Sequence, residues 1–227
     1  MASSGDAGDA GDAGERGTPA AQRGLVRRGY DAISFAYRGD DGQPASSSSE
    51  DVSRYAGWVE ELASLLPGMA IVVDLGCGAG LPATRKLTDH GLRVLGVDFS
   101  AVQLSRARYL VPAASLVQAD MTALHLQHGS VDAVVSFYAL IHVPLEDQLA
   151  MFPRIRCWLR HGGYLLAITG ADRWTGVETY LGAEMFWDHA DTASYLRWFA
   201  AARLEPVWHR YIREGNSGHS LILARAE

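Results

Sequence analysis

The sequence has few of the features that mark several large classes of protein. Its 227 residues contain only two cysteines, Cys77 and Cys157, so we do not expect a disulfide framework. No apolar run reaches the roughly 18 residues of a membrane span. The net charge of −6 argues against a nucleic-acid surface, because phosphates are bound by clustered lysine and arginine. The first residues also lack the basic and apolar segments of a secretory signal. Together these absences predict a cytoplasmic protein that binds neither membrane nor nucleic acid.

What the chain does contain suits one globular domain. Hydrophobic residues make up 48% of it, which is enough to bury a sizeable core. Residues 1–20 include three Gly-Asp-Ala units, and with nothing to bury they are expected to form a disordered acidic tail. Residues 21–227 would then form a single domain, opened by a helical cap at 21–66. We expect this domain to be a monomer or a homodimer.

Hydrophobic periodicity divides the domain into helices and strands. Apolar residues at helical spacing predict helices at 23–37 and 50–66, with a Gly-, Asp- and Ser-rich loop at 38–49 between them. Short apolar runs that alternate with helices follow, and this pattern indicates a parallel sheet covered on both faces. The predicted strands of this part are 70–75, 93–97, 115–118, 131–137 and 164–169. The predicted helices are 80–89, 101–110, 145–160 and 192–202, and Pro153 should kink or break the third of them.

The end of the chain has a different pattern. Two strands at 205–212 and 219–224 flank the turn residues 214–218, which is typical of a β-hairpin. The two strands of a hairpin run in opposite directions, so one antiparallel strand should join the parallel sheet. The sequence therefore predicts an α/β fold with a seven-stranded, mostly parallel sheet and an antiparallel C-terminal strand.

A glycine-rich segment lies where the first strand passes into a helix. Asp74 is near the end of the strand, and Gly76, Gly78 and Gly80 follow it. Glycines let the backbone turn tightly and approach a ligand without a Cβ atom in the way, and a helix N-terminus adds free N–H groups. Such a loop alone is weak evidence of a site. Here a strand precedes it and a helix follows it, which is the context that a ligand-binding loop requires.

Two acidic residues end the next two strands. Asp98 comes 22 residues after Gly76, and in a doubly wound sheet it would lie beside the glycine loop. A carboxylate there can accept hydrogen bonds from both hydroxyls of a ribose. Asp120 could hold an adenine amino group while its neighbour Met121 packs on the ring. The alternative for both acids is a helix cap or a turn residue.

These segments resemble the class I S-adenosylmethionine-dependent methyltransferases. The Asp-x-Gly-x-Gly-x-Gly loop looks like the first motif of that family, Asp98 matches its ribose-binding acid, and 119–121 looks like its adenine-contacting turn. Residues 134–143 are similar to its fourth motif. Residues 160–164 resemble its Pro-Gly-Gly turn, with histidine in place of proline.

The resemblance covers about residues 50–227. It implies a Rossmann-like fold with helices on both faces of the sheet and S-adenosylmethionine as the cofactor. The cofactor-binding residues that we assign from it are Asp74, Gly76, Cys77, Gly78, Gly80, Asp98, Phe99, Gln103, Asp120, Met121 and Phe137, with Tyr30 and Tyr37 of the N-terminal helix covering the cofactor.

The spacing of the glycines bears on two alternative functions. Dinucleotide-binding enzymes use Gly-x-Gly-x-x-Gly to seat a pyrophosphate, whereas this chain has Gly-x-Gly-x-Gly. Asp74 would repel a pyrophosphate but would suit the ammonium group of a methionyl moiety. This disfavours an NAD(P)-dependent oxidoreductase. A non-catalytic S-adenosylmethionine-binding protein would keep the glycine loop but have a blocked acceptor pocket.

Candidate catalytic residues follow the fourth strand. Tyr138 could line the channel of methyl transfer, and His142 could act as a general base. The alternative for His142 is a residue at a helix start that hydrogen-bonds to its own backbone. No Cys or His cluster has metal-ligand spacing, so no metal is expected.

The segment 170–190 is long for a connection and is predicted to be a lid-like insertion. Its alternative is a helix that packs its aromatic side chains into the core. The residues assigned to the acceptor are Trp174, Glu178 and Trp187 from this segment and His219 from the last strand. The sequence thus predicts an enzyme that methylates an oxygen, nitrogen or carbon atom of a small molecule, such as a secondary metabolite.

Overall fold

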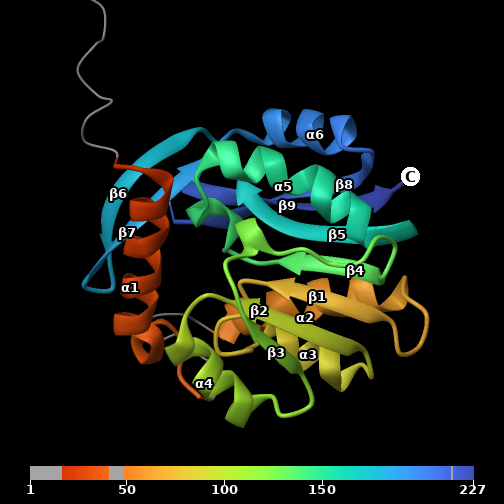
Figure 1. The fold of residues 1–227 in the computed structure, drawn as a ribbon, viewed down its shortest axis with the longest axis horizontal. Coiled ribbons are helices and arrows are strands. Elements are labelled where there is room, and N and C mark those ends of the chain that lie inside the picture. Colours follow the sequence, from red (N-terminus) through yellow and green to blue (C-terminus); the bar gives the residue numbers. More distant parts are fainter. Residues whose placement is uncertain (1–16, 41–48, 216) are drawn as a thin grey trace, which may run out of the picture.

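The structure is a computed structural model that describes residues 17–40, 49–215 and 217–227. The predicted tail up to residue 16, and most of the loop predicted at 38–49, lie outside the described residues. The described α-helices are α1 (Pro19–Tyr37), α2 (Ser49–Ser64), α3 (Ala83–Asp89), α4 (Ala101–Leu110), α5 (Leu145–Trp158) and α6 (Thr192–Ala201) (Figure 1). The strands are β1 (Ile71–Leu75), β2 (Arg93–Asp98), β3 (Ser115–Gln118), β4 (Val131–Ser136), β5 (Leu159–Gly170), β6 (Trp174–Tyr180), β7 (Ala183–His189), β8 (Leu204–Glu214) and β9 (Ser217–Ala226), and two short 3-10 helices are η1 (Met121–Ala123) and η2 (Leu140–His142).

Seven strands form one sheet in the order β3-β2-β1-β4-β5-β9-β8. The first five are parallel, and β9 is antiparallel to both of its neighbours, β5 and β8. The predicted fold class is therefore confirmed, including the antiparallel strand from the C-terminal hairpin. The chain reverses its direction of winding between β1 and β4, which is where open α/β sheets bind their ligands.

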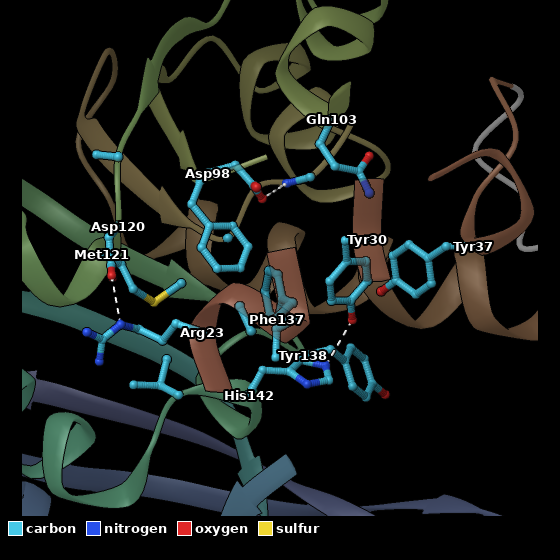
Figure 2. A pocket seen from close by; sticks show the side chains of 17 residues that line it. Arg23, Tyr30, Tyr37, Asp98, Gln103, Asp120, Met121, Phe137, Tyr138 and His142 are labelled. Atoms are coloured by element: carbon cyan, nitrogen blue, oxygen red, sulfur yellow. Dashed lines mark hydrogen bonds and ion pairs between the residues drawn. The ribbon is translucent and has the colours of Figure 1, made fainter. Parts of the chain in front are cut away.

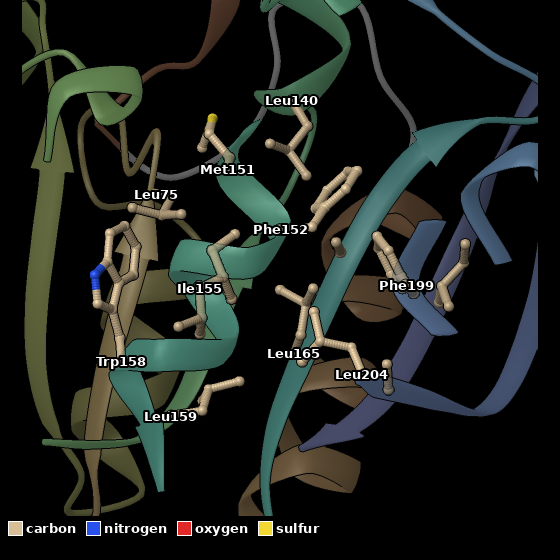
Figure 3. Packing of buried hydrophobic residues seen from close by; sticks show 14 of the residues in the cluster. Leu75, Leu140, Met151, Phe152, Ile155, Trp158, Leu159, Leu165, Phe199 and Leu204 are labelled. Atoms are coloured by element: carbon tan, nitrogen blue, oxygen red, sulfur yellow. The ribbon is translucent and has the colours of Figure 1, made fainter. Parts of the chain in front are cut away.

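The two faces of the sheet are covered by different helices. On one face, α5 and α6 pack with Phe152, Ile155 and Phe199 against the strands, as Figure 3 shows. On the other face, α2 and α3 contribute apolar side chains such as Val59 and Leu87. Alternate residues of a strand point to opposite faces, so the continuous apolar strands predicted from the sequence contribute side chains to the hydrophobic core on both faces of the sheet.

Helix boundaries differ from the predicted ones at three places. Helix α1 begins at Pro19, within the predicted tail of residues 1–20, because the side chain of Thr18 accepts a hydrogen bond from the N–H of Ala21 and proline suits the first helical position. Helix α3 begins at Ala83 rather than at residue 80. Helix α5 continues through Pro153, so the break considered there does not occur. The buried side chains of α5 around that proline hold the helix against the sheet.

The segment predicted to be a lid-like insertion is a β-hairpin. Strands β6 and β7 pair with each other in a separate two-stranded sheet. Leu181 and Gly182 join them with φ angles of 51° and 87°, as a tight two-residue turn requires. The alternative of a helix is therefore wrong, whereas the lid-like role of the segment stays a prediction. The alternation of Thr175, Val177 and Thr179 with other residues in β6 was the signal for a strand.

Helix α1 lies at the carboxyl ends of the strands, beside this hairpin (Figure 1). Gly29 makes the close approach of α1 to β7 possible, since a Cβ atom there would lie 2.5 Å from the sulfur of Met185. In the described ranges, no helix has the length and apolar character needed to cross a membrane.

Candidate active site

The glycine loop turns sharply from β1 toward α3. Gly76, Gly78 and Gly80 have φ angles of 77°, 55° and 79°, in the region that glycine adopts most readily. A Cβ atom on Gly76 would lie 2.2 Å from that of Ala139, so the loop passes directly beneath the segment after β4. The N–H groups of residues 76 and 77 both donate to the carbonyl of Val97 at the end of β2. The loop is therefore fixed by its backbone.

Asp98 connects this loop to β2. Its buried carboxylate accepts hydrogen bonds from the N–H of Gly78 at 2.9 Å and from the N–H of Ser100 at 2.8 Å. Burial raises the pKa of Asp98 to about 6, although these backbone hydrogen bonds oppose the rise. The sequence alternatives for Asp98 were a ribose ligand and a turn residue. In the structure it makes the turn contact and also lines the cavity described next.

A cavity opens beside the loop, and the space between its lining residues, open solvent included, is about 650 Å³ (Figure 2). Helix α1 closes one side of it with Arg23, Val26, Tyr30 and Tyr37. Of the residues assigned to the cofactor from the sequence, those that line this cavity are Gly76, Gly78, Asp98, Phe99, Gln103, Asp120, Met121, Phe137, Tyr30 and Tyr37.

A smaller cavity of about 420 Å³ shares several lining residues with the first and contains Asp74 and Cys77. Burial raises the pKa of Asp74 to about 7, and a 2.6 Å hydrogen bond from the hydroxyl of Thr84 opposes the rise. Arg38 lines the same cavity, with its guanidinium 5.4 Å from the ring centres of Tyr37 and Tyr55. A cation and a carboxyl group thus face one small space.

Gly80 lines neither cavity. A Cβ atom on it would lie 2.8 Å from a methyl group of Val111, so this glycine allows the loop to pack against the end of α4. Gly76 and Gly78 therefore line the candidate site, whereas Gly80 packs against α4.

Asp120 has two partners at the other end of the larger cavity. Its carboxylate caps η1 by accepting from the N–H of Thr122 at 2.8 Å, and it pairs with Arg23 of α1 at 2.9 Å (Figure 2). Arg23 also forms an ion pair with Asp147. Asp120 therefore has the capping role that was the alternative to adenine binding. Sequence reasoning missed Arg23, because nothing in its own segment distinguishes it from the other arginines of α1.

His142 is fully engaged in hydrogen bonds. Its Nδ1 lies 2.7 Å from the carbonyl of Phe186, so Nδ1 carries the proton that it donates. Its Nε2 lies 2.9 Å from the hydroxyl of Tyr30, which must then be the donor (Figure 2). Burial lowers the pKa of His142 to about 4. The imidazole is thus neutral and its Nε2 already accepts a hydrogen bond from Tyr30, which argues against the predicted role as a general base.

Tyr138 and His219 meet at a residue that sequence reasoning missed. The Tyr138 hydroxyl donates to one carboxylate oxygen of Glu214, and Nδ1 of His219 lies 3.1 Å from the other. Burial alone would raise the pKa of Glu214, but hydrogen bonds from His219 and Tyr138 lower it below its ordinary value. Glu214 is the last residue of β8, and in the predicted turn 214–218 its charge gave no signal.

The residues assigned to the acceptor lie in different surroundings. Trp187 packs on His142, with ring centres 4.1 Å apart, and its buried indole N–H has no hydrogen-bond partner among the described residues. Trp174 is 46% exposed, and Glu178 is exposed as well. Neither these three residues nor His219 line the two cavities described above.

Arg106 of α4 fastens the end of α1. Its buried guanidinium donates to the carbonyls of Ser34 and Arg38 at 2.6 and 2.7 Å and pairs with Asp40 at 2.6 Å. Together with Arg23 at the start of the helix, it holds α1 over the cavity. Within the part of the chain that the structure describes, no group of three or more His, Cys, Asp or Glu side chains is arranged to hold a metal ion.

Comparisons with known proteins agree with this arrangement. The model of a family described as a methyltransferase domain matches residues 72–163. Carboxy-S-adenosyl-L-methionine synthase of Aliivibrio salmonicida is 34% identical over 104 residues, which are 42% of this chain and 42% of that protein. Trans-aconitate 2-methyltransferase of Paracidovorax citrulli is 41% identical over 97 residues, which are 41% of this chain and 36% of that protein. The alignments thus span less than half the length of these relatives.

A solved structure covers more of the chain. The 1,6-didemethyltoxoflavin-N1-methyltransferase of Burkholderia thailandensis, with bound 1,6-didemethyltoxoflavin and S-adenosylhomocysteine, has a TM-score of 0.69 over 92% of this chain and 91% of that one. At 18% identity this likeness shows the fold alone. The family predicted from the sequence, and its cofactor S-adenosylmethionine, are confirmed by these matches. Residues 72–163 match the methyltransferase domain family, and the described chain has the Rossmann-like class I fold of S-adenosylmethionine-dependent methyltransferases.

Proposed function

We propose that this protein transfers the methyl group of S-adenosylmethionine to an oxygen, nitrogen or carbon atom of a small molecule. The observation that carries the proposal is the cavity of about 650 Å³ between the glycine loop, Asp98 and α1. It lies at the point where the order of the strands reverses, and its lining combines aromatic faces with a buried carboxylate. We also propose that residues 21–227 form a single domain and that residues 21–66 cap the site.

The lining fits the nucleoside part of S-adenosylmethionine. Gly78 offers backbone without a side chain, and no atom of the described residues lies closer than 4.0 Å to the place of a Cβ atom there. Asp98 has lone pairs left after its two backbone hydrogen bonds and can accept from ribose hydroxyls. Phe99 and Met121 would pack on the adenine, while Asp120 remains bound to Arg23.

The smaller cavity fits the amino-acid part of the same molecule. A methionyl group carries an ammonium and a carboxylate. Asp74 can provide a negative charge for the ammonium, and Arg38 provides a positive charge for the carboxylate. An ammonium beside Asp74 would favour its ionised form over the protonated form that burial favours. We infer that Asp74 takes the ammonium and that Arg38 takes the carboxylate.

The aromatic residues near Tyr138 would surround the reacting centre. When bound, S-adenosylmethionine supplies an activated methyl group on a positively charged sulfur. The faces of Tyr30, Tyr37 and Phe137 can stabilise a cation and exclude water. The remaining task of the chain is to position an acceptor and to accept its proton where it has one.

Titration calorimetry with S-adenosylmethionine and with NAD tests the cofactor assignment. We expect binding of the first and no heat with the second. Methyl-tritiated S-adenosylmethionine is then mixed with a deproteinised metabolite extract, and we expect label in a small-molecule product. NAD binding alone would support the oxidoreductase alternative. Binding of S-adenosylmethionine without labelled product from any extract would support the non-catalytic alternative.

A further inference from the structure

Three side chains from separate segments converge at the end of β8. Tyr138 follows β4, Glu214 ends β8, and His219 lies near the start of β9. Both Tyr138 and His219 direct a polar atom to the Glu214 carboxylate. Each ring is therefore oriented by a contact with the same carboxylate, which joins the segment after β4 to the β8–β9 hairpin.

The contact with Glu214 determines which nitrogen of His219 carries the proton. Glu214 is ionised, because hydrogen bonds lower its pKa, so it can only accept. Nδ1 of His219 must therefore be the donor, which leaves the lone pair on Nε2. Among the residues that the structure describes, none forms a hydrogen bond with this Nε2, and the side chain is 15% exposed. His219 thus presents an available proton acceptor.

His142 differs from His219 in this respect. It is held by the Phe186 carbonyl, and its Nε2 already accepts from Tyr30. An acceptor molecule would have to displace that tyrosine before it could use His142. The third histidine nearby, His189, is buried with its Nδ1 2.7 Å from the carbonyl of Asp172. Burial lowers its pKa, which makes it a weaker base.

His219 is separated from the cofactor cavity by a single ring. Tyr138 lines the cavity, and its ring meets that of His219 edge to face, with centres 5.3 Å apart. Tyr138 has a φ angle of 54°, an uncommon conformation for a residue with a side chain, which often marks functional segments. An acceptor that extends from the cavity past the edge of the Tyr138 ring would therefore reach His219.

Building on the proposed function, we propose that His219, positioned by Glu214, accepts a proton from the methyl acceptor, and that this acceptor carries an ionisable O–H or N–H group. The O–H or N–H bond breaks, and its proton moves to Nε2 of His219. The electron pair left on the acceptor forms the bond to the methyl carbon, while the former carbon–sulfur pair stays on the sulfur. The proton then leaves to solvent, which restores His219. Glu214 is a positioning residue in this scheme.

The first test needs neither cofactor nor acceptor. Histidine-selective ¹⁵N NMR of the full chain reports which ring nitrogen is protonated, and His219→Asn assigns the signal. We expect His219 to carry its proton on Nδ1, and Glu214→Gln to reduce the population of that tautomer. A wild-type protein with the proton on Nε2, or a tautomer unchanged in Glu214→Gln, would overturn the positioning by Glu214.

The second test follows label from methyl-tritiated S-adenosylmethionine into a metabolite extract. His219→Ala should lower the rate of labelling by about 100- to 10,000-fold, as for loss of a general base, and leave the affinity for S-adenosylhomocysteine unchanged. Added imidazole should restore part of the rate, which it would not do if His219 only packed the hairpin. His209→Ala is the matched control, because His209 is exposed on the same hairpin.

Each outcome decides between the two proposals. If the wild-type protein labels a product and His219→Ala labels it equally fast, the role of His219 is wrong while methyl transfer stands. A labelled product in which the methylated atom carried no hydrogen before the reaction would also contradict the role of His219 while methyl transfer stands. If the wild-type protein binds S-adenosylmethionine but labels nothing, the proposed function itself fails. Glu214→Gln should reproduce part of the loss with normal melting, which excludes misfolding as the cause.

Discussion

The two halves of the candidate site are built in different ways. The half around the glycine loop comes from residues 74–121 and is fixed by backbone hydrogen bonds, such as those from Gly76 and Cys77 to the carbonyl of Val97. The half around Tyr138 is fixed by side chains from distant segments. The Tyr30–His142 contact joins residues 112 positions apart, and Tyr138–Glu214 joins residues 76 apart. A site half made by backbone geometry leaves a motif in the sequence, whereas one made by side-chain contacts does not.

The largest effect should come from Asp98, which connects the loop to the proposed ribose position. Asp98→Ala removes the acceptor for two N–H groups and for the ribose, and it should weaken S-adenosylhomocysteine binding by about 2–4 kcal/mol. That is roughly a 30- to 700-fold rise in Kd. Calorimetry measures it, with the exposed Asp89→Ala as control. An unchanged Kd would remove Asp98 from the cofactor site.

The backbone character of the loop can be tested with two glycines that share a conformation. Gly76 and Gly91 have φ angles of 77° and 75°, but only at Gly76 would a Cβ atom collide with Ala139. Gly91→Ala should cost about 1 kcal/mol of unfolding free energy from the strained conformation. Gly76→Ala should cost about 3 kcal/mol, because the clash adds to the strain. Denaturant melts compare them, and equal losses would show that the clash is relieved without cost.

In the half of the site that is fixed by side chains, stability should depend most on the residue that anchors α1. Arg106→Ala removes the guanidinium that donates to the carbonyls of Ser34 and Arg38 and should cost about 2–3 kcal/mol. Hydrogen exchange in α1 should become faster before that in the sheet. Arg108→Ala on the exposed side of the same helix should cost less than about 0.5 kcal/mol. Protection of α1 that is unchanged by Arg106→Ala would contradict this role.

The smallest effect concerns Asp74 and pH. Its pKa of about 7 in the folded protein is above the ordinary value of 3.8, so the folded state keeps a proton that the unfolded chain loses first. Stability due to this group is therefore present at low pH and falls as pH rises, by up to about 2 kcal/mol between pH 5 and pH 7. Asp74→Asn should remove that part of the decline, as melting temperatures at each pH would show. Parallel pH curves for both proteins would mean that Asp74 is ionised throughout.

The fold could be predicted well because its signals are local. The strand β3 has the predicted bounds, and the hairpin at the end gave the antiparallel strand. The hairpin β6–β7 was missed, because its length suggested a loop and its aromatic residues also suited a helix. Pro153 was expected to interrupt a helix that the buried side chains on both sides of it maintain.

The sequence predicted those parts of the candidate site that are built from short local segments. Asp98 and the glycines follow from the spacing of strand ends, which puts them at one edge of the sheet. Arg23, Arg38 and Glu214 gave no signal, since an arginine in an amphipathic helix or a glutamate in a turn is ordinary on its own. His142 was selected by its position after β4, but its hydrogen bonds to Phe186 and Tyr30 were invisible in the sequence.

By itself, the sequence determined the strands of the main sheet and the helices between them, the turn at the glycine loop and the acids that end β2 and follow β3. These depend on period, spacing and the conformations open to glycine, all of which are properties of short segments. Only the tertiary structure decided which histidine keeps a free nitrogen and which carboxylates already have partners. Those states depend on burial and on contacts between segments that can be far apart in the chain, as with Tyr138 and Glu214, which are 76 positions apart.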